Sequence, residues 1–116
     1  MTFEEFNEAI RARSAHPQGF NMVVDDWTIS DWFVSIMGEL GEAANVVKKL
    51  NRSRTGARGN REGDDVLREK LRKELGDTYV TLVLLAQAVD VDLHAAAVEV
   101  FNAKSAEIGY PVVLKA

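Results

Sequence analysis

The stretch that decides the fold runs from residue 30 to residue 50 and reads Ser-Asp-Trp-Phe-Val-Ser-Ile-Met-Gly-Glu-Leu-Gly-Glu-Ala-Ala-Asn-Val-Val-Lys-Lys-Leu. Its apolar residues recur three or four positions apart, which is the spacing of an amphipathic helix. The stripe consists of Phe33, Ile36, Met37, Leu40, Ala43, Ala44 and Val47. We therefore predict a helix over residues 30–50 that packs through this stripe.

Three further helices follow from the same spacing and from their end signals. Thr2 and Glu5 form a capping box before the first, which ends near Pro17. Asp92 is a favoured N-cap residue for the last, and Gly109 followed by Pro111 ends it. The predicted helices span residues 2–15, 30–50, 65–89 and 92–108. No segment alternates with period two, so the prediction is an all-α, four-helix-bundle-like fold in a single domain, residues 1–116.

The composition excludes several kinds of site. The chain has no cysteine, which rules out disulfides, zinc–thiolate sites, iron–sulfur clusters and cysteine nucleophiles. No apolar run reaches the roughly 18 residues of a membrane span. The segment from Met1 to Glu5 is acidic and is not a secretory leader, so we expect a cytoplasmic protein without a membrane partner.

A short acidic phrase occurs twice, as Glu39-Leu40-Gly41-Glu42 and as Glu74-Leu75-Gly76-Asp77. Residues three apart are neighbours on one helix face, and both pairs flank the apolar stripe of their helix. Four carboxylates between two packed helices would repel one another unless a cation lay among them. Oxygen-only ligands suit Mg²⁺, or Mn²⁺ in its place, so the sequence predicts a metal site.

Each phrase also contains a glycine, which costs a helix about 1 kcal/mol relative to alanine. Gly41 and Gly76 therefore indicate a close approach, either by a ligand or metal or by a tightly packed helix. The sequence leaves both explanations open.

Charge is unevenly distributed along a chain whose net charge is −4. Residues 48–61 contain six basic side chains and no acidic one, which fits either a solvated loop or contacts to a polyphosphate beside the metal. The acidic balance argues against stable nucleic-acid binding.

Other catalytic chemistry lacks its residues. His16 and His94 have Arg13 and Val91 three positions before them, so neither completes the Glu-x-x-His pair of a di-iron bundle. No Gly-x-x-x-x-Gly-Lys phosphate loop occurs, and no serine–histidine–acid arrangement is evident.

The segment from Tyr79 to Val89 is apolar on almost every side. A helix of this kind is buried on several faces, and in a small bundle a second subunit provides the additional cover. We therefore expect a homodimer or a tetramer formed as a dimer of dimers.

Four motifs of the chain occur together in one known superfamily: Gly38-Glu39-Leu40-Gly41-Glu42-Ala43-Ala44-Asn45, Lys48-Lys49, Glu74-Leu75-Gly76-Asp77 and Phe101-Asn102-Ala103-Lys104-Ser105. With them the chain resembles the MazG-like all-α NTP pyrophosphohydrolases, a superfamily that includes the dimeric all-α dUTPases, the dCTP pyrophosphatases and phosphoribosyl-ATP pyrophosphatase. The resemblance extends from Phe6-Asn7 to Gly109-Tyr110-Pro111, although the linker between the acidic pairs is longer and richer in arginine and glycine than in compact members.

The resemblance implies an enzyme that converts a nucleoside triphosphate to the monophosphate and pyrophosphate with Mg²⁺. It implies that Glu39, Glu42, Glu74 and Asp77 are catalytic metal ligands. A carboxylate that is not fully used as a ligand can act as general base on a metal-bound water, and we expect Glu42 or Glu39 to do so. Asn102 and Lys104 are implied contacts to phosphate or substrate.

Two further candidates for substrate contacts come from the residues themselves. Lys48 belongs to the basic segment. Trp32, with Trp27 and Phe20, would either stack on a nucleobase or lie in the core.

Two other functions compete with this expectation. Phosphoribosyl-ATP pyrophosphatase would use similar acids on a similar bundle. A non-catalytic helical interaction module would instead use the acidic flank to bind a basic partner, without metal.

Overall fold

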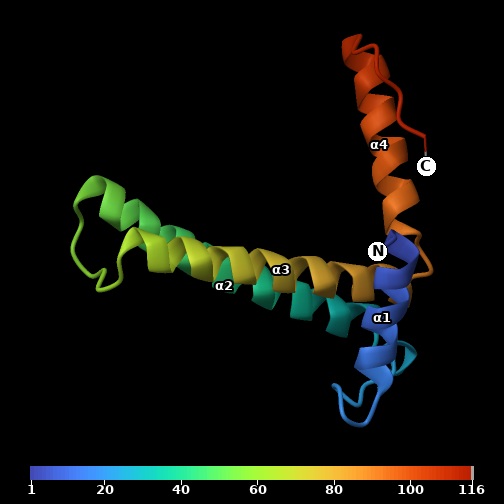
Figure 1. Ribbon diagram of the computed structural model, residues 1–116, viewed down its shortest axis with the longest axis horizontal. Coiled ribbons are helices and arrows are strands. Elements are labelled where there is room, and N and C mark those ends of the chain that lie inside the picture. The colour runs from blue at the N-terminus through green and yellow to red at the C-terminus, as the bar shows by residue number, and fades with distance from the viewer. Residues whose placement is uncertain (116) are drawn as a thin grey trace.

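The computed structural model describes residues 1–115 and confirms the all-α, bundle-like prediction (Figure 1). Among those residues there is no β-strand. The elements are α1 (Phe3–Ala15), a 3-10 turn η1 (Val24–Asp26), α2 (Ile29–Thr55), α3 (Asp64–Ala88) and α4 (Leu93–Ile108). The observed ends lie within one residue of the predicted ones except at the end of α2, which continues five residues further, to Thr55.

Local hydrogen bonds explain where the first two helices begin. The Thr2 side chain accepts a hydrogen bond from the Glu5 amide at 3.1 Å, and the Glu5 carboxylate accepts one from the Thr2 amide at 2.6 Å. A second capping box, which the sequence prediction missed, joins Thr28 to Asp31 at the start of α2. These bonds satisfy amides that have no partner inside the helix.

The later helix ends follow the predicted signals. The Asp92 carboxylate accepts a hydrogen bond from the Ala95 amide at 3.0 Å and caps α4. Gly109 ends α4 with φ +79°, a left-handed conformation that favours glycine. Gly56 ends α2 in the same way, with φ +74°.

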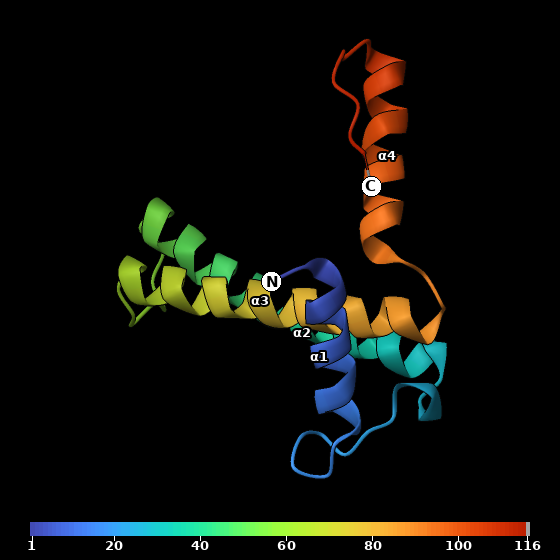
Figure 2. The same cartoon turned by 45° about the vertical axis from the view of Figure 1, so that its right-hand side comes forward.

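The two longest helices, α2 and α3, lie side by side and antiparallel, and α1 crosses them near the start of α2 (Figures 1 and 2). The largest core cluster lies at this crossing and contains Ile10, Val24, Trp32, Val83 and Leu84. The antiparallel pairing brings the middle of α2 opposite the middle of α3, where the repeated acidic phrases are placed.

Only part of the predicted stripe on α2 is buried. Ile36 and Ala43 are buried, but Phe33, Met37 and Leu40 are each more than 40% exposed. A single partner helix, α3, covers one side of α2 and leaves the other side of this wide stripe in solvent. Within one chain, the stripe that the sequence predicts to pack is therefore covered only in part.

The fourth helix does not join the bundle of its own chain. It leaves α3 at an angle of 99° and projects away from α2 and α3 (Figures 1 and 2). The radius of gyration is 17.8 Å, whereas a compact chain of this length would have about 13 Å. Val100 and Ile108 on α4 are about 70% exposed, so the arm presents apolar side chains to solvent.

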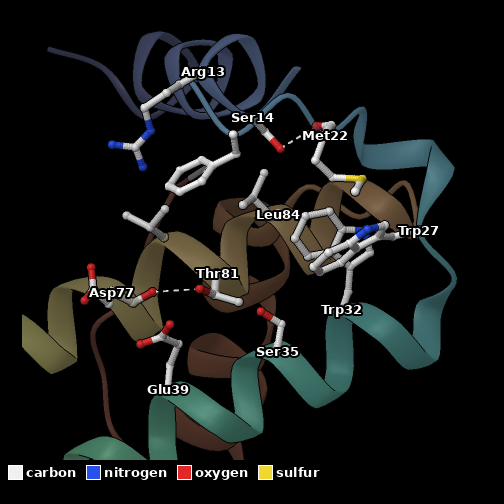
Figure 3. A pocket seen from close by; sticks show the side chains of 12 residues that line it. Arg13, Ser14, Met22, Trp27, Trp32, Ser35, Glu39, Asp77, Thr81 and Leu84 are labelled. Carbon is white, nitrogen blue, oxygen red and sulfur yellow. Dashed lines mark hydrogen bonds between the residues drawn. The ribbon is translucent and has the colours of Figure 1, made fainter. Parts of the chain in front are cut away.

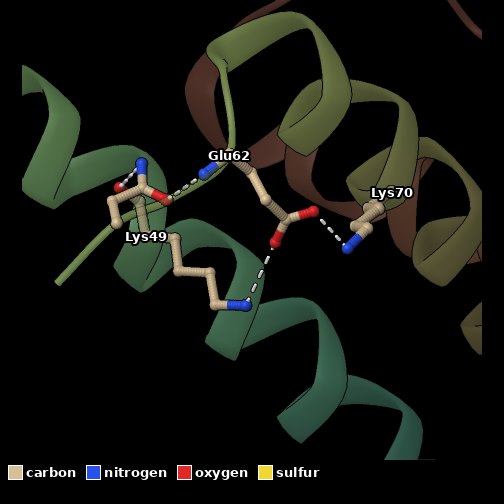
Figure 4. A network of polar contacts seen from close by, with 4 residues as sticks. Lys49, Glu62 and Lys70 are labelled. Atoms are coloured by element: carbon tan, nitrogen blue, oxygen red, sulfur yellow. Dashed lines mark hydrogen bonds and ion pairs between the residues drawn. The ribbon is translucent and has the colours of Figure 1, made fainter.

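Part of the connector between α2 and α3 is held by a polar network (Figure 4). Glu62 pairs with Lys49 at 3.4 Å and also with Lys70, which links the end of α2 to the start of α3. Asn60 donates to the Lys49 carbonyl and accepts from the Glu62 amide, each at 3.3 Å. The predicted linker over residues 51–64 thus contains helix up to Thr55 and a fixed turn at residues 60–62.

No single helix within residues 1–115 has the length and apolar character to cross a membrane; α3 and α4 taken together, with their bend, meet that criterion by length and composition.

Candidate metal centre

Three of the four predicted metal ligands converge between α2 and α3. Glu39 of α2 lies opposite Glu74 and Asp77 of α3, and one carboxylate oxygen from each lies within 4.8 Å of the others. The acids meet because each pair flanks the apolar stripe of its helix and the two helices are antiparallel. Glu39 and Glu74 are partly buried, and Asp77 is exposed.

The fourth predicted ligand, Glu42, lies at the border of this cluster. It is exposed, and it does not belong to the group of three whose oxygens converge. It is nevertheless near enough that its charge contributes to the raised pKa of both Glu39 and Glu74. We call the four residues together the acidic cluster.

The electrostatics of the acidic cluster are repulsive. Burial is the largest cause that raises the pKa of Glu39, followed by the charges of Glu42, Asp77 and Glu74. Burial also raises the pKa of Glu74, followed by hydrogen bonding and repulsion with Glu42 and by the charge of Asp77. No positive side chain is among the causes of either shift. Negative charge therefore accumulates here without compensation from a basic neighbour.

The residues fit a hard divalent cation. Glu39 Oε2 and Glu74 Oε2 are buried and accept no hydrogen bond from any residue in the described part of the chain. Buried oxygens without a donor are costly, and a bound cation would satisfy them. A donor set made only of carboxylate oxygens suits Mg²⁺ or Mn²⁺.

The two helical glycines have open space beside them. A Cβ atom added to Gly41 or Gly76 would meet nothing within 4 Å among residues 1–115. Tight packing of a helix in the same chain, one of the two explanations considered for these glycines, is therefore wrong. Neither glycine is required by the packing of its own chain.

A cavity of about 300 Å³ opens beside the acidic cluster, and Glu39 and Asp77 form part of its wall (Figure 3). Two indoles form another part of the wall: Trp27 and Trp32 lie with ring centres 4.5 Å apart and planes tilted by 45°. The cavity therefore combines anionic and aromatic walls. The remaining lining residues are Arg13, Ser14, Phe20, Met22, Ser35, Val80, Thr81 and Leu84.

Trp32 lies in the core and also borders this cavity. It is only 3% exposed, and its Nε1 donates a hydrogen bond to the Val24 carbonyl at 2.9 Å. A fixed indole of this kind can serve as a wall for a planar ring without moving.

None of the other three predicted substrate contacts lines the cavity within one chain. Asn102 uses its amide group on the C-terminal segment, donating to and accepting from the backbone of Leu114 at 2.8 Å. Lys104 Nζ lies 3.2 Å from both carboxylate oxygens of Glu107. Both lie on α4, which points away from α2 and α3 (Figure 1). Lys48 is exposed, does not line the cavity, and follows Glu39 by nine residues, about 14 Å along α2.

The sequence prediction missed Arg13 on α1. The position of Arg13 around the helix could have indicated its place, because it lies between Ile10 and Ser14, the two buried residues of α1. Residues three and four apart share a face, so Arg13 borders the face that α1 presents to the rest of the protein.

The comparisons with known proteins add no relative. No family model matches the chain, and neither a curated protein nor a solved structure matches it.

Proposed function

We propose that this protein is a Mg²⁺-dependent nucleotide pyrophosphohydrolase, as its resemblance to the MazG-like enzymes implies. The observation that carries the proposal is that Glu39 and Asp77 belong both to the acidic cluster and to the wall of the cavity. A nucleotide needs this combination, with cation ligands near its phosphates and an apolar, aromatic surface near its base.

The roles follow from placement. Glu39, Glu74 and Asp77 would hold the cation, which when bound neutralises phosphate charge and lowers the pKa of water. Glu42 lies outside the converging group and is exposed, so its carboxylate is available to take a proton from an attacking water. This favours Glu42 over Glu39 as the general base. The base would lie against the wall that Trp27 and Trp32 form.

The direct test is release of pyrophosphate from a panel of nucleoside triphosphates and deoxynucleoside triphosphates with Mg²⁺. The panel includes phosphoribosyl-ATP, because preference for that substrate would support the alternative pyrophosphatase. We expect Glu42→Gln and Asp77→Asn to fold with native helicity and to lose activity. Glu99→Gln, on the exposed face of α4, is the matched control and keeps activity. Full activity in both cluster variants would refute the assignment.

A non-catalytic interaction module remains the alternative from another class. In that case the acidic cluster would bind a basic partner and not a cation. Calorimetry with Mg²⁺ or Mn²⁺, alone and with a nucleotide analogue, separates the two functions. Absence of heat and of thermal stabilisation in the wild type would favour the module.

Self-association as a homodimer or a dimer of dimers is part of this proposal, as is a cytoplasmic location. The exposed residues on α2 repeat at alternating intervals of four and three, the spacing of a coiled-coil seam: Phe33, Met37, Leu40, Ala44 and Val47. Sedimentation at micromolar concentration tests the assembly. We expect Met37→Glu to shift the protein toward the monomer, and a monomeric wild type would refute it.

A further inference from the structure

One cationic side chain faces the acidic part of the cavity. Arg13 is the only basic residue among those that line it, and it forms no ion pair with any residue in 1–115. In Figure 3 the Arg13 side chain descends from α1 at the end of the cavity where Asp77 and Glu39 lie, away from the Trp27 and Trp32 rings. The cavity thus has a charged end and an aromatic end.

The turn after α1 is built so that Arg13 has this position. The Phe20 amide donates to the Arg13 carbonyl at 3.2 Å, and the Ser14 hydroxyl donates to the Met22 carbonyl at 2.7 Å. Gly19 is required for this return, because an added Cβ would lie 2.0 Å from the Arg13 carbonyl oxygen. The chain therefore folds back against Arg13 and brings Phe20 beside it.

Phe20 supports the guanidinium. The Arg13 Cζ atom lies 5.2 Å from the centre of the Phe20 ring, within the range of a cation–π contact. Phe20 is 68% exposed, so it contributes little to the core. Its contact orients the guanidinium and leaves the N–H donors unused by the protein.

We propose that Arg13 binds phosphate oxygens of the nucleotide across the cavity from the acidic cluster, as a positioning residue supported by Phe20. The inference rests on the proposed function. A polyphosphate held through a cation at Glu39 and Asp77 still has anionic oxygens on its opposite side. Arginine suits these oxygens because its planar fork of donors can bind two of them at once.

The test is calorimetry on the full chain with Mg²⁺ and a series of ligands with different phosphate counts: a non-hydrolysable nucleoside triphosphate, the diphosphate, the monophosphate and the nucleoside. For Arg13→Gln we expect affinity for the triphosphate to fall about tenfold or more, with a smaller loss for each phosphate removed and none for the nucleoside. Arg13→Lys keeps the positive charge but not the planar fork of donors, so its affinity for the triphosphate should lie between those of the wild type and Arg13→Gln.

Arg11→Gln is the matched control. Arg11 lies two residues away on α1, pairs with Asp25 at 3.1 Å and does not line the cavity. We expect its nucleotide affinities to match those of the wild type. Circular dichroism checks that each variant is folded.

The outcomes separate the inference from the function on which it rests. If the wild type binds the triphosphate and Arg13→Gln binds it equally well, this inference is overturned and the proposed function stands. An equal loss for the nucleoside and the triphosphate would also overturn it, because Arg13 would then act on the base or on the fold. A wild type that binds Mg²⁺ but no nucleotide overturns the proposed function, and this inference with it.

Discussion

Replacing Glu39 by glutamine should stabilise the protein when no divalent cation is present. Glu39 is the most strongly surrounded member of the acidic cluster, with burial and three neighbouring carboxylates all raising its pKa. Glutamine has nearly the same shape and no charge. The substitution therefore removes repulsion while the helix and its packing are preserved.

The size of the effect follows from the geometry. The carboxylate oxygens of the group of three lie within 4.8 Å of one another, and at that distance two unit charges repel by about 0.9 kcal/mol at the dielectric constant of water. Neutral Glu39 removes its repulsion with both Glu74 and Asp77. Screening at 0.1 M salt reduces the total to about 1 kcal/mol. For a chain of this size that corresponds to roughly 4 °C in the midpoint of thermal unfolding.

The assay is thermal unfolding at pH 8 in a chelator, at low and moderate salt, followed by the same measurement with Mg²⁺. The Glu39→Gln variant should be more stable than the wild type in chelator, and more so at low salt. With Mg²⁺ the difference between the two midpoints should shrink or change sign, because the wild type gains stability by binding the cation and the variant has lost a ligand. Glu99→Gln controls for the loss of one charge elsewhere and should change the midpoint little.

A clear result would refute the reasoning. If Glu39→Gln is no more stable than the wild type in chelator at low salt, the carboxylates do not repel one another as the structure indicates. If it is more stable but the wild type does not respond to Mg²⁺ or Mn²⁺, the repulsion is real and the metal site is wrong.

Three further predictions follow from the same structure. Folding raises the pKa of Glu39 and Glu74 above the ordinary 4.5, so their contribution to the free energy of unfolding in chelator should fall as the pH rises above about 4.5 and level off above the raised values. Urea titrations of the wild type and Glu39→Gln from pH 4 to pH 8 isolate the part due to Glu39, because the lowered pKa values of Asp31, Glu62 and Glu69 act in the opposite direction in both proteins. Trp32→Phe should cost about 1–3 kcal/mol by urea denaturation, because it removes the hydrogen bond to the Val24 carbonyl and leaves a void in the core. Glu62→Gln should lower the free energy of unfolding only slightly, and less at high salt, because its two lysine partners are about half exposed; the same denaturation in low and high salt checks this.

The sequence predicted helix positions well because their signals are local. Capping residues and a terminal glycine depend on hydrogen bonds within four or five residues, and these are preserved in any tertiary context. The end of α2 was missed because Gly56, and not the basic composition after Leu50, stops the helix. Charged residues such as Arg52 and Arg54 are good helix formers, so a basic segment alone does not indicate a loop.

The convergence of Glu39, Glu74 and Asp77 was also predictable, since it needs only two phased helices in contact. The cavity was less predictable from the sequence. Arg13 and Phe20 come together through a turn that depends on Gly19, and no periodicity of the sequence encodes that return. The direction of α4 was not predictable either, because its apolar stripe does not specify which surface it covers.

That direction links the implied role of Lys104 to the proposed self-association. The α3–α4 junction is fixed by backbone hydrogen bonds, from the Asp90 amide to the Gln87 carbonyl at 3.2 Å and from the Val91 amide to the Ala86 carbonyl at 2.9 Å. Lys104 lies eleven residues beyond the start of α4, about 17 Å along an arm that leads away from Glu39. With the junction intact, Lys104 can approach an acidic cluster only in a second copy of the chain. A catalytic role for Lys104 therefore requires an assembly that places α4 of one copy against α2 and α3 of another. If the active enzyme is strictly monomeric, Lys104 has no such role, and Arg13 is the basic side chain of the cavity that remains available to the phosphates.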